Sequence, residues 1–288
     1  MVVMYSTLIS VARLQDLMGS GAPLLVFDCS YDLMNPAAGG EQYLHAHLPG
    51  AVHADLGRNL SAHGEAPRSS GGRHPLPERA AFAAWLASRG LDSGQQVVVY
   101  DRQGVNHCGR LWWMLKWCGH EPVAVLDGGL QAWEAAGGAL ENGPARQRPS
   151  GNFSLQVSRA RTVDTAGVVR ALGSPEQTLI DARAHARFRG DIEPLDPVAG
   201  HIPGALNRPF GQNFGPGGLF KPAHELRAEF EALLAGRDAA SVVHQCGSGV
   251  SAIPNLLAME AAGLGRTTLY PGSWSEWCRT PGLPCARA

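Results

Sequence analysis

Short apolar runs recur along the chain, and longer stretches with helical spacing lie between them. Residues 24–28 and residues 97–101 are runs of Leu, Val and aromatic side chains that end in an acid. Runs without alternating polar positions are typical of strands buried on both faces of a parallel sheet. Between these two runs, residues 78–90 carry Phe82, Trp85 and Leu86 at the spacing of one helix face. The pattern therefore predicts an α/β fold with a mainly parallel sheet flanked by helices.

The pattern of the first half of the chain returns in the second half. His47-Leu48-Pro49-Gly50 is repeated as His201-Ile202-Pro203-Gly204. Four further landmarks follow the same order, and their pairs are residues 24–28 with 178–183, 78–90 with 223–236, 97–101 with 242–246, and 125–133 with 269–277. A repeat of domain size indicates a tandem duplication rather than a solenoid. We predict an N-terminal domain at residues 1–140, a linker rich in Pro, Gly and polar residues at 141–157, and a C-terminal domain at 158–288.

The second-half strand 242–246 ends at Cys246, directly before a loop with two glycines and a predicted helix. A loop between a strand and a helix can turn several backbone N–H groups inward, and the positive end of the helix dipole adds to them. Such a loop favours an anion and should stabilise a thiolate. A lone cysteine is otherwise often a small buried hydrophobe, but the flanking Gly247 and Gly249 favour the reactive interpretation. The first-half repeat carries Asp101 at the cysteine position, so we expect one reactive site per chain.

Composition narrows the possible partners. The chain has 288 residues, a formal net charge of −1 and no long basic run, which disfavours nucleic acid and acidic membranes as partners. No apolar run is long enough to span a bilayer, and residues 1–7 lack the features of a secretory signal. The six cysteines are scattered and form no C-x-x-C pair, which disfavours a disulfide framework or a zinc site. We expect a soluble cytoplasmic protein with reduced thiols and no metal.

Taken together, the repeat and the cysteine loop resemble the two-domain rhodanese-like sulfurtransferases, which include the 3-mercaptopyruvate and thiosulfate sulfurtransferases. The resemblance extends from about Leu24 to Trp277. It rests on the repeated His-x-Pro-Gly, the Cys246 loop and four further motifs: Asp181-Ala182-Arg183, Arg187-Phe188-Arg189-Gly190, Asp127-Gly128-Gly129 and Pro271-Gly272-Ser273-Trp274. In that family the first domain is catalytically silent and often has an acid at the cysteine position, as Asp101 does here.

The resemblance implies covalent sulfur transfer. The Cys246 thiolate would take sulfur from a donor, release pyruvate or sulfite, and remain as a persulfide until a thiophile removes the sulfur. The acceptor would be cyanide, a small thiol or thioredoxin. The loop amides of Gly247, Ser248, Gly249, Val250 and Ser251 would stabilise the thiolate and the persulfide, without a metal or an organic cofactor. A monomer is expected, because the two halves can supply their own interface.

The identity of the donor depends on the charges around the loop. Enzymes that prefer the thiosulfate dianion tend to carry cations inside the loop, and this loop has none. It is more similar to the loop of the mercaptopyruvate enzymes, with Ser251 in place of the usual threonine. Arg187 matches the family's substrate-binding arginine, and Arg183 would support it. A second arginine that is often found before the His-Ile-Pro-Gly motif is missing from residues 191–200, so thiosulfate stays open as the donor.

The family has also been given a Ser-His-Asp relay that would polarise the leaving group. Ser248 and His74 match two of its members. The position of the acid is Gly57, and Asp55 is the nearest acid that could replace it.

The residues around Cys246 also bear on two other classes of protein. A cysteine phosphatase or arsenate reductase would need an arginine at position 252, where this chain has Ala252. A non-catalytic binding or sulfur-carrier module would not need the intact Cys246 loop, although Ile253-Pro254 departs from the family's usual Cys-His. Cys278 and Cys285 lie seven residues apart and are either a redox pair or incidental.

Overall fold

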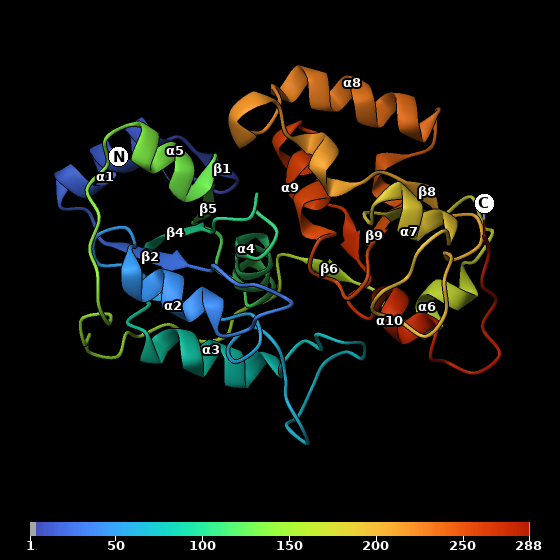
Figure 1. The fold of residues 1–288 in the computed structure, drawn as a ribbon, viewed down its shortest axis with the longest axis horizontal. Helices are drawn as coiled ribbons and strands as arrows, with labels where there is room; N and C mark the ends of the chain where they lie inside the picture. Colours follow the sequence, from blue (N-terminus) through green and yellow to red (C-terminus); the bar gives the residue numbers. More distant parts are fainter. Residues whose placement is uncertain (1–3, 288) are drawn as a thin grey trace. The chain divides into compact units, whose positions relative to one another are not determined.

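The structure is a computed structural model that describes residues 4–287, and these residues form two compact units (Figure 1). Unit 1 comprises the chain up to Pro67, Pro77–Arg159 and Pro216–Leu219. Unit 2 comprises Arg68–Leu76, Ala160–Gly215 and the chain from Phe220 onward. The loop Arg68–Leu76, which comes from the first half of the sequence, is thus part of unit 2. Residues 1–3, on which part of the prediction about a secretory signal rests, lie outside the described residues.

Unit 1 is built on a five-stranded parallel sheet in the order β1-β5-β4-β2-β3. Its strands are β1 (Leu8–Ile9), β2 (Leu24–Asp28), β3 (Val52–His53), β4 (Gln96–Tyr100) and β5 (Val123–Leu126). Its helices are α1 (Val11–Ser20), α2 (Ala38–His45), α3 (Arg79–Ser88), α4 (Cys108–Trp117) and α5 (Gly129–Ala135). Strand β4 lies at the centre of the sheet and pairs along its whole length with β2, so that Gln96 is opposite Leu24 and Tyr100 is opposite Asp28.

The core of unit 1 covers both faces of this sheet. On one face, Val98 and Tyr100 of β4 pack in a buried cluster with Leu14 of α1 and Trp133 of α5. Helix α4 packs against β4 and β5, and every one of its residues is buried. Burial on both faces explains why the strands appear in the sequence as continuous apolar runs.

Unit 2 repeats this topology with a five-stranded parallel sheet in the order β6-β10-β9-β7-β8. Its strands are β6 (Arg161–Thr162), β7 (Thr178–Asp181), β8 (Leu206–Asn207), β9 (Val242–Gln245) and β10 (Thr268–Leu269). Its helices are α6 (Thr165–Arg170), α7 (His185–Arg189), α8 (Ala223–Leu234), α9 (Ile253–Ala261) and α10 (Ser273–Trp277), with short 3₁₀ turns at Phe210–Asn213 and Ala239–Ser241. Because the two strand orders correspond one to one, the predicted tandem duplication of an α/β domain is confirmed.

The repeated His-x-Pro-Gly motif has the same local role in both units. The His47 ring stacks on Tyr43 with 4.1 Å between ring centroids, and the His201 ring stacks on Phe188 at 3.9 Å. In each case Nδ1 of the histidine lies 2.8 Å from the backbone carbonyl of its stacking partner. These two histidines therefore anchor the chain before the edge strands β3 and β8.

Two further properties of the described residues concern membrane spans and cysteines. No helix in residues 4–287 is both long enough and apolar enough to cross a bilayer. The six cysteines are free thiols, and Cys246 is among the buried ones.

Candidate active site

Cys246 follows β9 directly, at the carboxyl end of the central strand of unit 2. Its side chain is enclosed, with the residue only 1% exposed. The backbone N–H of Cys246 donates to Ser273 Oγ at 3.1 Å, and its carbonyl accepts from the backbone N–H of Trp274 at 3.0 Å. These bonds hold the cysteine against the first turn of α10.

The loop after Cys246 leads into α9, which begins at Ile253 with Pro254 in its first turn. Proline is tolerated there because a helix leaves its first N–H groups without intrahelical acceptors. Gly249 has φ +72°, and a Cβ at this position would lie 2.3 Å from the carbonyl oxygen of Pro271. Only glycine fits this close approach, which brings the loop down onto the segment before α10.

Backbone donors of this loop remain without acceptors. In the described part of the chain, no atom accepts a hydrogen bond from the backbone N–H of Ser248, Val250 or Ser251. Ser248 and Val250 are nevertheless buried, at 6% and 4% exposed. Since buried backbone N–H groups are nearly always paired in folded proteins, these donors indicate a place for an anion.

The corresponding loop of unit 1 closes around an anion of its own. Asp101 follows β4 as Cys246 follows β9, and its carboxylate accepts four backbone N–H bonds. Oδ1 accepts from Gln103 and Val105 at 2.9 and 3.0 Å, and Oδ2 accepts from His107 and Cys108 at 2.8 and 2.9 Å. Counted along the chain, Gln103 and Val105 correspond to Ser248 and Val250 of the Cys246 loop. The same loop design therefore suits negative charge at residue 246.

Arg187 lies in α7 beside the cysteine loop. Its Nη2 is 2.6 Å from Glu193 Oε1 and 3.5 Å from Asp196 Oδ2. Its Nη1 is 3.6 Å from the place where a Cβ on Gly247 would stand, and it has no acceptor among the described residues. The guanidinium is thus held by two carboxylates while one nitrogen faces the loop.

Arg73 supplies a second guanidinium at the same place, which no motif in the sequence predicted. Its Nη1 donates to Asp196 Oδ1 at 2.8 Å, and its backbone N–H donates to Ser275 Oγ at 3.0 Å. Its Nη2 lies 3.0 Å from the Cβ position of Gly247. The one feature of the sequence that could have indicated a role for Arg73 is its position directly before His74. Two guanidiniums therefore meet at the residue that follows Cys246.

Arg183 binds groups of the protein itself, whereas Arg73 and Arg187 each have a guanidinium nitrogen that faces Gly247. Its side chain is only 2% exposed and binds both carboxylate oxygens of Asp181, with the shortest distance 2.7 Å from Nη2 to Oδ2. It also donates to the carbonyl of Gly200 at 2.7 Å and lies over the Trp274 ring at 4.9 Å from the centroid. Burial alone would lower the pKa of Arg183, but Asp181 and Glu193 outweigh it and raise the pKa. The charge of this guanidinium is therefore largely balanced within the protein.

Residues 191–200, where a further arginine was expected and missing, supply acids instead. Both carboxylates that hold the arginines, Glu193 and Asp196, come from this segment, and their side chains are 3% and 0% exposed. Sequence reasoning missed both acids, because only the folded chain brings them to the arginines.

His74 and Ser248 lie in contact, as their proposed roles require. His74 Nδ1 is 2.8 Å from Ser248 Oγ, and both residues are buried. The loop that carries His74 lies against the start of α10, since a Cβ on Gly72 would stand 2.6 Å from the carbonyl oxygen of Gly272.

Asp55, the predicted substitute for an acid at Gly57, belongs to unit 1. Its Oδ1 accepts from the backbone N–H of Arg58 at 2.8 Å and lies 3.1 Å from the Cβ position of Gly57. The Asp55 carboxylate thus fills the space beside residue 57. Its part in a relay stays a prediction.

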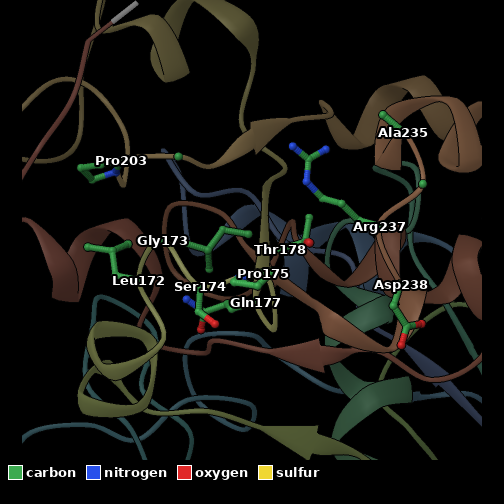
Figure 2. Close-up of a pocket in the computed structure, with 13 residues that line it drawn as sticks. Leu172, Gly173, Ser174, Pro175, Gln177, Thr178, Pro203, Ala235, Arg237 and Asp238 are labelled. Atoms are coloured by element: carbon green, nitrogen blue, oxygen red, sulfur yellow. The ribbon is translucent and has the colours of Figure 1, made fainter.

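Two hollows of unit 2 differ in their relation to the cysteine. The hollow that we call the α10 pocket has a volume of about 400 Å³ and is lined by Gly72, Arg73, Ser275, Glu276, Arg279 and Thr280. A larger hollow has a volume of about 740 Å³. Figure 2 shows Gln177, Thr178 and Arg237 among the residues that line it. It lies where β7 begins and ahead of β8 and β9, whereas Cys246 follows the end of β9. Because the strands are parallel, this larger hollow is at the edge of the sheet opposite the cysteine.

Comparison with known proteins places these features in a family. The family model described as "Rhodanese-like domain" matches residues 10–136 and again residues 165–280. A protein of Pseudomonas aeruginosa named "Probable 3-mercaptopyruvate sulfurtransferase" is 47% identical over 266 residues, which cover 91% of this chain and 92% of that protein. The "Thiosulfate/3-mercaptopyruvate sulfurtransferase 2" of Arabidopsis thaliana is 32% identical, with coverage of 91% and 82%.

A solved structure agrees with both the fold and these relatives. SseA from Escherichia coli, described as a 3-mercaptopyruvate sulfotransferase with the rhodanese fold, superimposes with a TM-score of 0.77. The identity is 31%, and the match covers 94% of this chain and 100% of SseA.

Proposed function

The chain belongs to the family of two-domain rhodanese-like sulfurtransferases, and we propose that it moves sulfur from 3-mercaptopyruvate to a thiophilic acceptor through a persulfide on Cys246. One observation supports this choice of residues above the others. The guanidiniums of Arg73 and Arg187 meet at Gly247, next to the buried Cys246, in a loop whose backbone N–H groups of Ser248, Val250 and Ser251 have no acceptor among the described residues. A carboxylate-bearing donor bound to these guanidiniums would bring its sulfur towards Cys246.

In the first half of the reaction, Arg187 and Arg73 bind the donor carboxylate by charge-assisted hydrogen bonds. The Cys246 thiolate attacks the donor sulfur, so that a sulfur–sulfur bond forms and the sulfur–carbon bond of the donor breaks. The electron pair of the broken bond goes to the carbon as the enolate of pyruvate, which takes up a proton. Ser248 and His74, in contact at 2.8 Å, are the groups that would supply this proton.

In the second half, a thiophile attacks the outer sulfur of the persulfide. The sulfur–sulfur bond breaks, its electron pair returns to Cys246 as a thiolate, and the acceptor leaves with the sulfur. The backbone N–H groups of Ser248, Val250 and Ser251 stabilise the negative charge before and after this step. Arg183 does not touch the donor in this scheme, because its bonds to Asp181 and Gly200 give it a positioning part.

Thiosulfate is the second candidate donor, and a specific observation favours it. Two guanidiniums beside Gly247 offer more positive charge than the loop sequence indicated, which suits a dianion as well as a monocarboxylate. A phosphatase is disfavoured because the position that its arginine would occupy is held by Ala252, which is 0% exposed. Thioredoxin as the acceptor, the monomeric state and the cytoplasmic location stay predictions.

The test combines mass spectrometry with kinetics. Protein incubated with 3-mercaptopyruvate alone should release pyruvate and gain the mass of one sulfur on Cys246, and Cys246→Ser should do neither. Sulfur found on another cysteine would refute the mechanism. A comparison of kcat/KM for 3-mercaptopyruvate and thiosulfate then decides between the donors, and a higher value for thiosulfate would overturn the assignment of 3-mercaptopyruvate as the donor.

A further inference from the structure

We propose that the α10 pocket binds the sulfur acceptor, and that this acceptor is a small thiol carrying an α-amino-acid group. The proposal rests on the function proposed above, since it concerns the second half of that reaction. The pocket holds two kinds of charge that such a thiol complements: the guanidinium of Arg279 for its carboxylate and the carboxylate of Glu276 for its ammonium group.

The pocket adjoins the cysteine loop through two of its lining residues. Arg73 lines the pocket and also reaches the Cβ position of Gly247 with its Nη2, at 3.0 Å. Ser275 lines the pocket and donates its backbone N–H to the carbonyl of Gly247 at 2.9 Å. The pocket and the residue after Cys246 therefore share Arg73 and Ser275 as neighbours. An acceptor whose charged groups are held in the pocket would extend its thiol past these two residues to the persulfide.

Arg279 is the cation that the donor site does not use. Its Nη1 donates to Asp196 Oδ1 at 2.9 Å and to the carbonyl of Ser275 at 2.7 Å. Its Nε and Nη2 have no acceptor among the described residues, and the side chain is 49% exposed. The guanidinium is thus fixed at one end and open to a ligand at the other, as a carboxylate-binding group should be.

Asp196 links this pocket to the donor site. One fully buried carboxylate oxygen, Oδ1, accepts from both Arg73 and Arg279. The two arginines are therefore held side by side, so that Arg73 can serve the donor at Gly247 while Arg279 serves the acceptor.

Glu276 provides the opposite charge in the same pocket. Its carboxylate lies over two glycines, with carboxylate atoms 2.6 Å or less from the Cβ positions of Gly71 and Gly272. It makes no hydrogen bond or ion pair within the described part of the chain. Because Gly71 and Gly272 have no side chains, the carboxylate of Glu276 has room at this place. It can therefore bind the ammonium group of a ligand. A zwitterionic thiol accordingly fits the pocket better than cyanide or a neutral thiol.

The test measures the KM of four acceptors at saturating 3-mercaptopyruvate: cysteine, 3-mercaptopropionate, cysteamine and 2-mercaptoethanol. Arg279→Gln should raise KM for the two carboxylates by roughly ten- to a hundredfold, and Glu276→Gln should do the same for the two amines. Both variants should leave KM for 2-mercaptoethanol within about twofold of the unchanged protein, because this thiol makes neither contact. Arg189→Gln is the matched control, since the Arg189 side chain is 50% exposed in the same unit and pairs with Asp191.

The single-turnover release of pyruvate separates this role from a structural one. It involves no acceptor and should keep its rate in Glu276→Gln, because Glu276 pairs with neither arginine of the donor site among the described residues. Equal changes of KM for all four thiols, or a slower pyruvate release in Glu276→Gln, would overturn the acceptor pocket. If the unchanged protein released no pyruvate at all, the proposed function itself would fail, which is a different result.

Discussion

His74 Nδ1 and Ser248 Oγ lie 2.8 Å apart in unit 2, although 174 positions of sequence separate the two residues. The contact is buried, so water cannot easily replace either partner. Ser248 belongs to the Cys246 loop, where the enolate formed from 3-mercaptopyruvate would need a proton. Sulfite released from thiosulfate would need none, so the His74–Ser248 pair should affect the two sulfur donors differently.

We predict that Ser248→Ala and His74→Gln each lower kcat for 3-mercaptopyruvate by roughly a hundredfold, with a much smaller effect on thiosulfate. The reason is that pyruvate leaves as an enolate that must be protonated on carbon, whereas sulfite leaves as a stable anion. Steady-state kinetics with both donors measure this difference. The double variant should be little slower than either single variant, because the two side chains act as a unit. Equal losses with both donors would contradict a proton-supplying role.

Arg187→Ala and Arg73→Ala should raise KM for 3-mercaptopyruvate, with a loss in kcat/KM worth about 1 to 3 kcal/mol for each. Each change removes one of the guanidiniums that face Gly247. Arg189→Ala serves as the control, because this neighbouring side chain of α7 is exposed and pairs with Asp191. If Arg73→Ala left KM unchanged, Arg73 would only position Asp196.

Asp101→Asn should destabilise the protein by at least about 2 kcal/mol, measured by denaturant unfolding. The carboxylate accepts four backbone N–H bonds, and an amide would turn an NH₂ group towards some of these donors. Asp16→Asn is the control, since the Asp16 side chain is 69% exposed and, among residues 4–287, pairs with the exposed Arg13 alone. Equal stability of the two variants would show that the loop of unit 1 does not depend on its internal anion.

His244 should make the protein less stable as the pH falls below about 6.5. Burial, followed by the charge of Arg208, lowers the pKa of His244 to about 3. The unfolded chain therefore binds a proton that the folded chain rejects, and stability is lost between about pH 6.5 and the folded value, by up to about 1.4 kcal/mol per pH unit.

The measurement is the free energy of unfolding at pH 7 and pH 5 for the unchanged protein and for His244→Leu. The variant should show the smaller difference between the two pH values, by on the order of 2 kcal/mol, whatever its stability at pH 7. His120, whose pKa burial lowers to about 4, contributes in the same direction and is left in place in both proteins. An unchanged pH dependence would mean that His244 does not carry the effect.

The sequence by itself determined the duplicated α/β fold and the position of Cys246, the cysteine proposed to carry the sulfur. Strands buried on both faces must be continuous apolar runs, so residues such as Val97–Val99 and Val242–Val243 marked β4 and β9 without any knowledge of their partners. Cys246 and Asp101 stand directly after those strands, and the glycines of the loop are local requirements of the backbone. All of these features depend on neighbours within a few residues.

Only the tertiary structure decided which charges surround the cysteine. Arg73 and Asp196 pair across 123 positions of sequence, and Arg279 joins the same carboxylate from 83 positions away. Arg183 and Arg187 lie four residues apart and could not be told apart by their sequence context. In the fold, the guanidinium of Arg183 binds Asp181 and the carbonyl of Gly200, whereas one nitrogen of Arg187 faces Gly247. A guanidinium's role depends on which acceptors the fold brings to it, and no pattern of residue types along the chain contains that information.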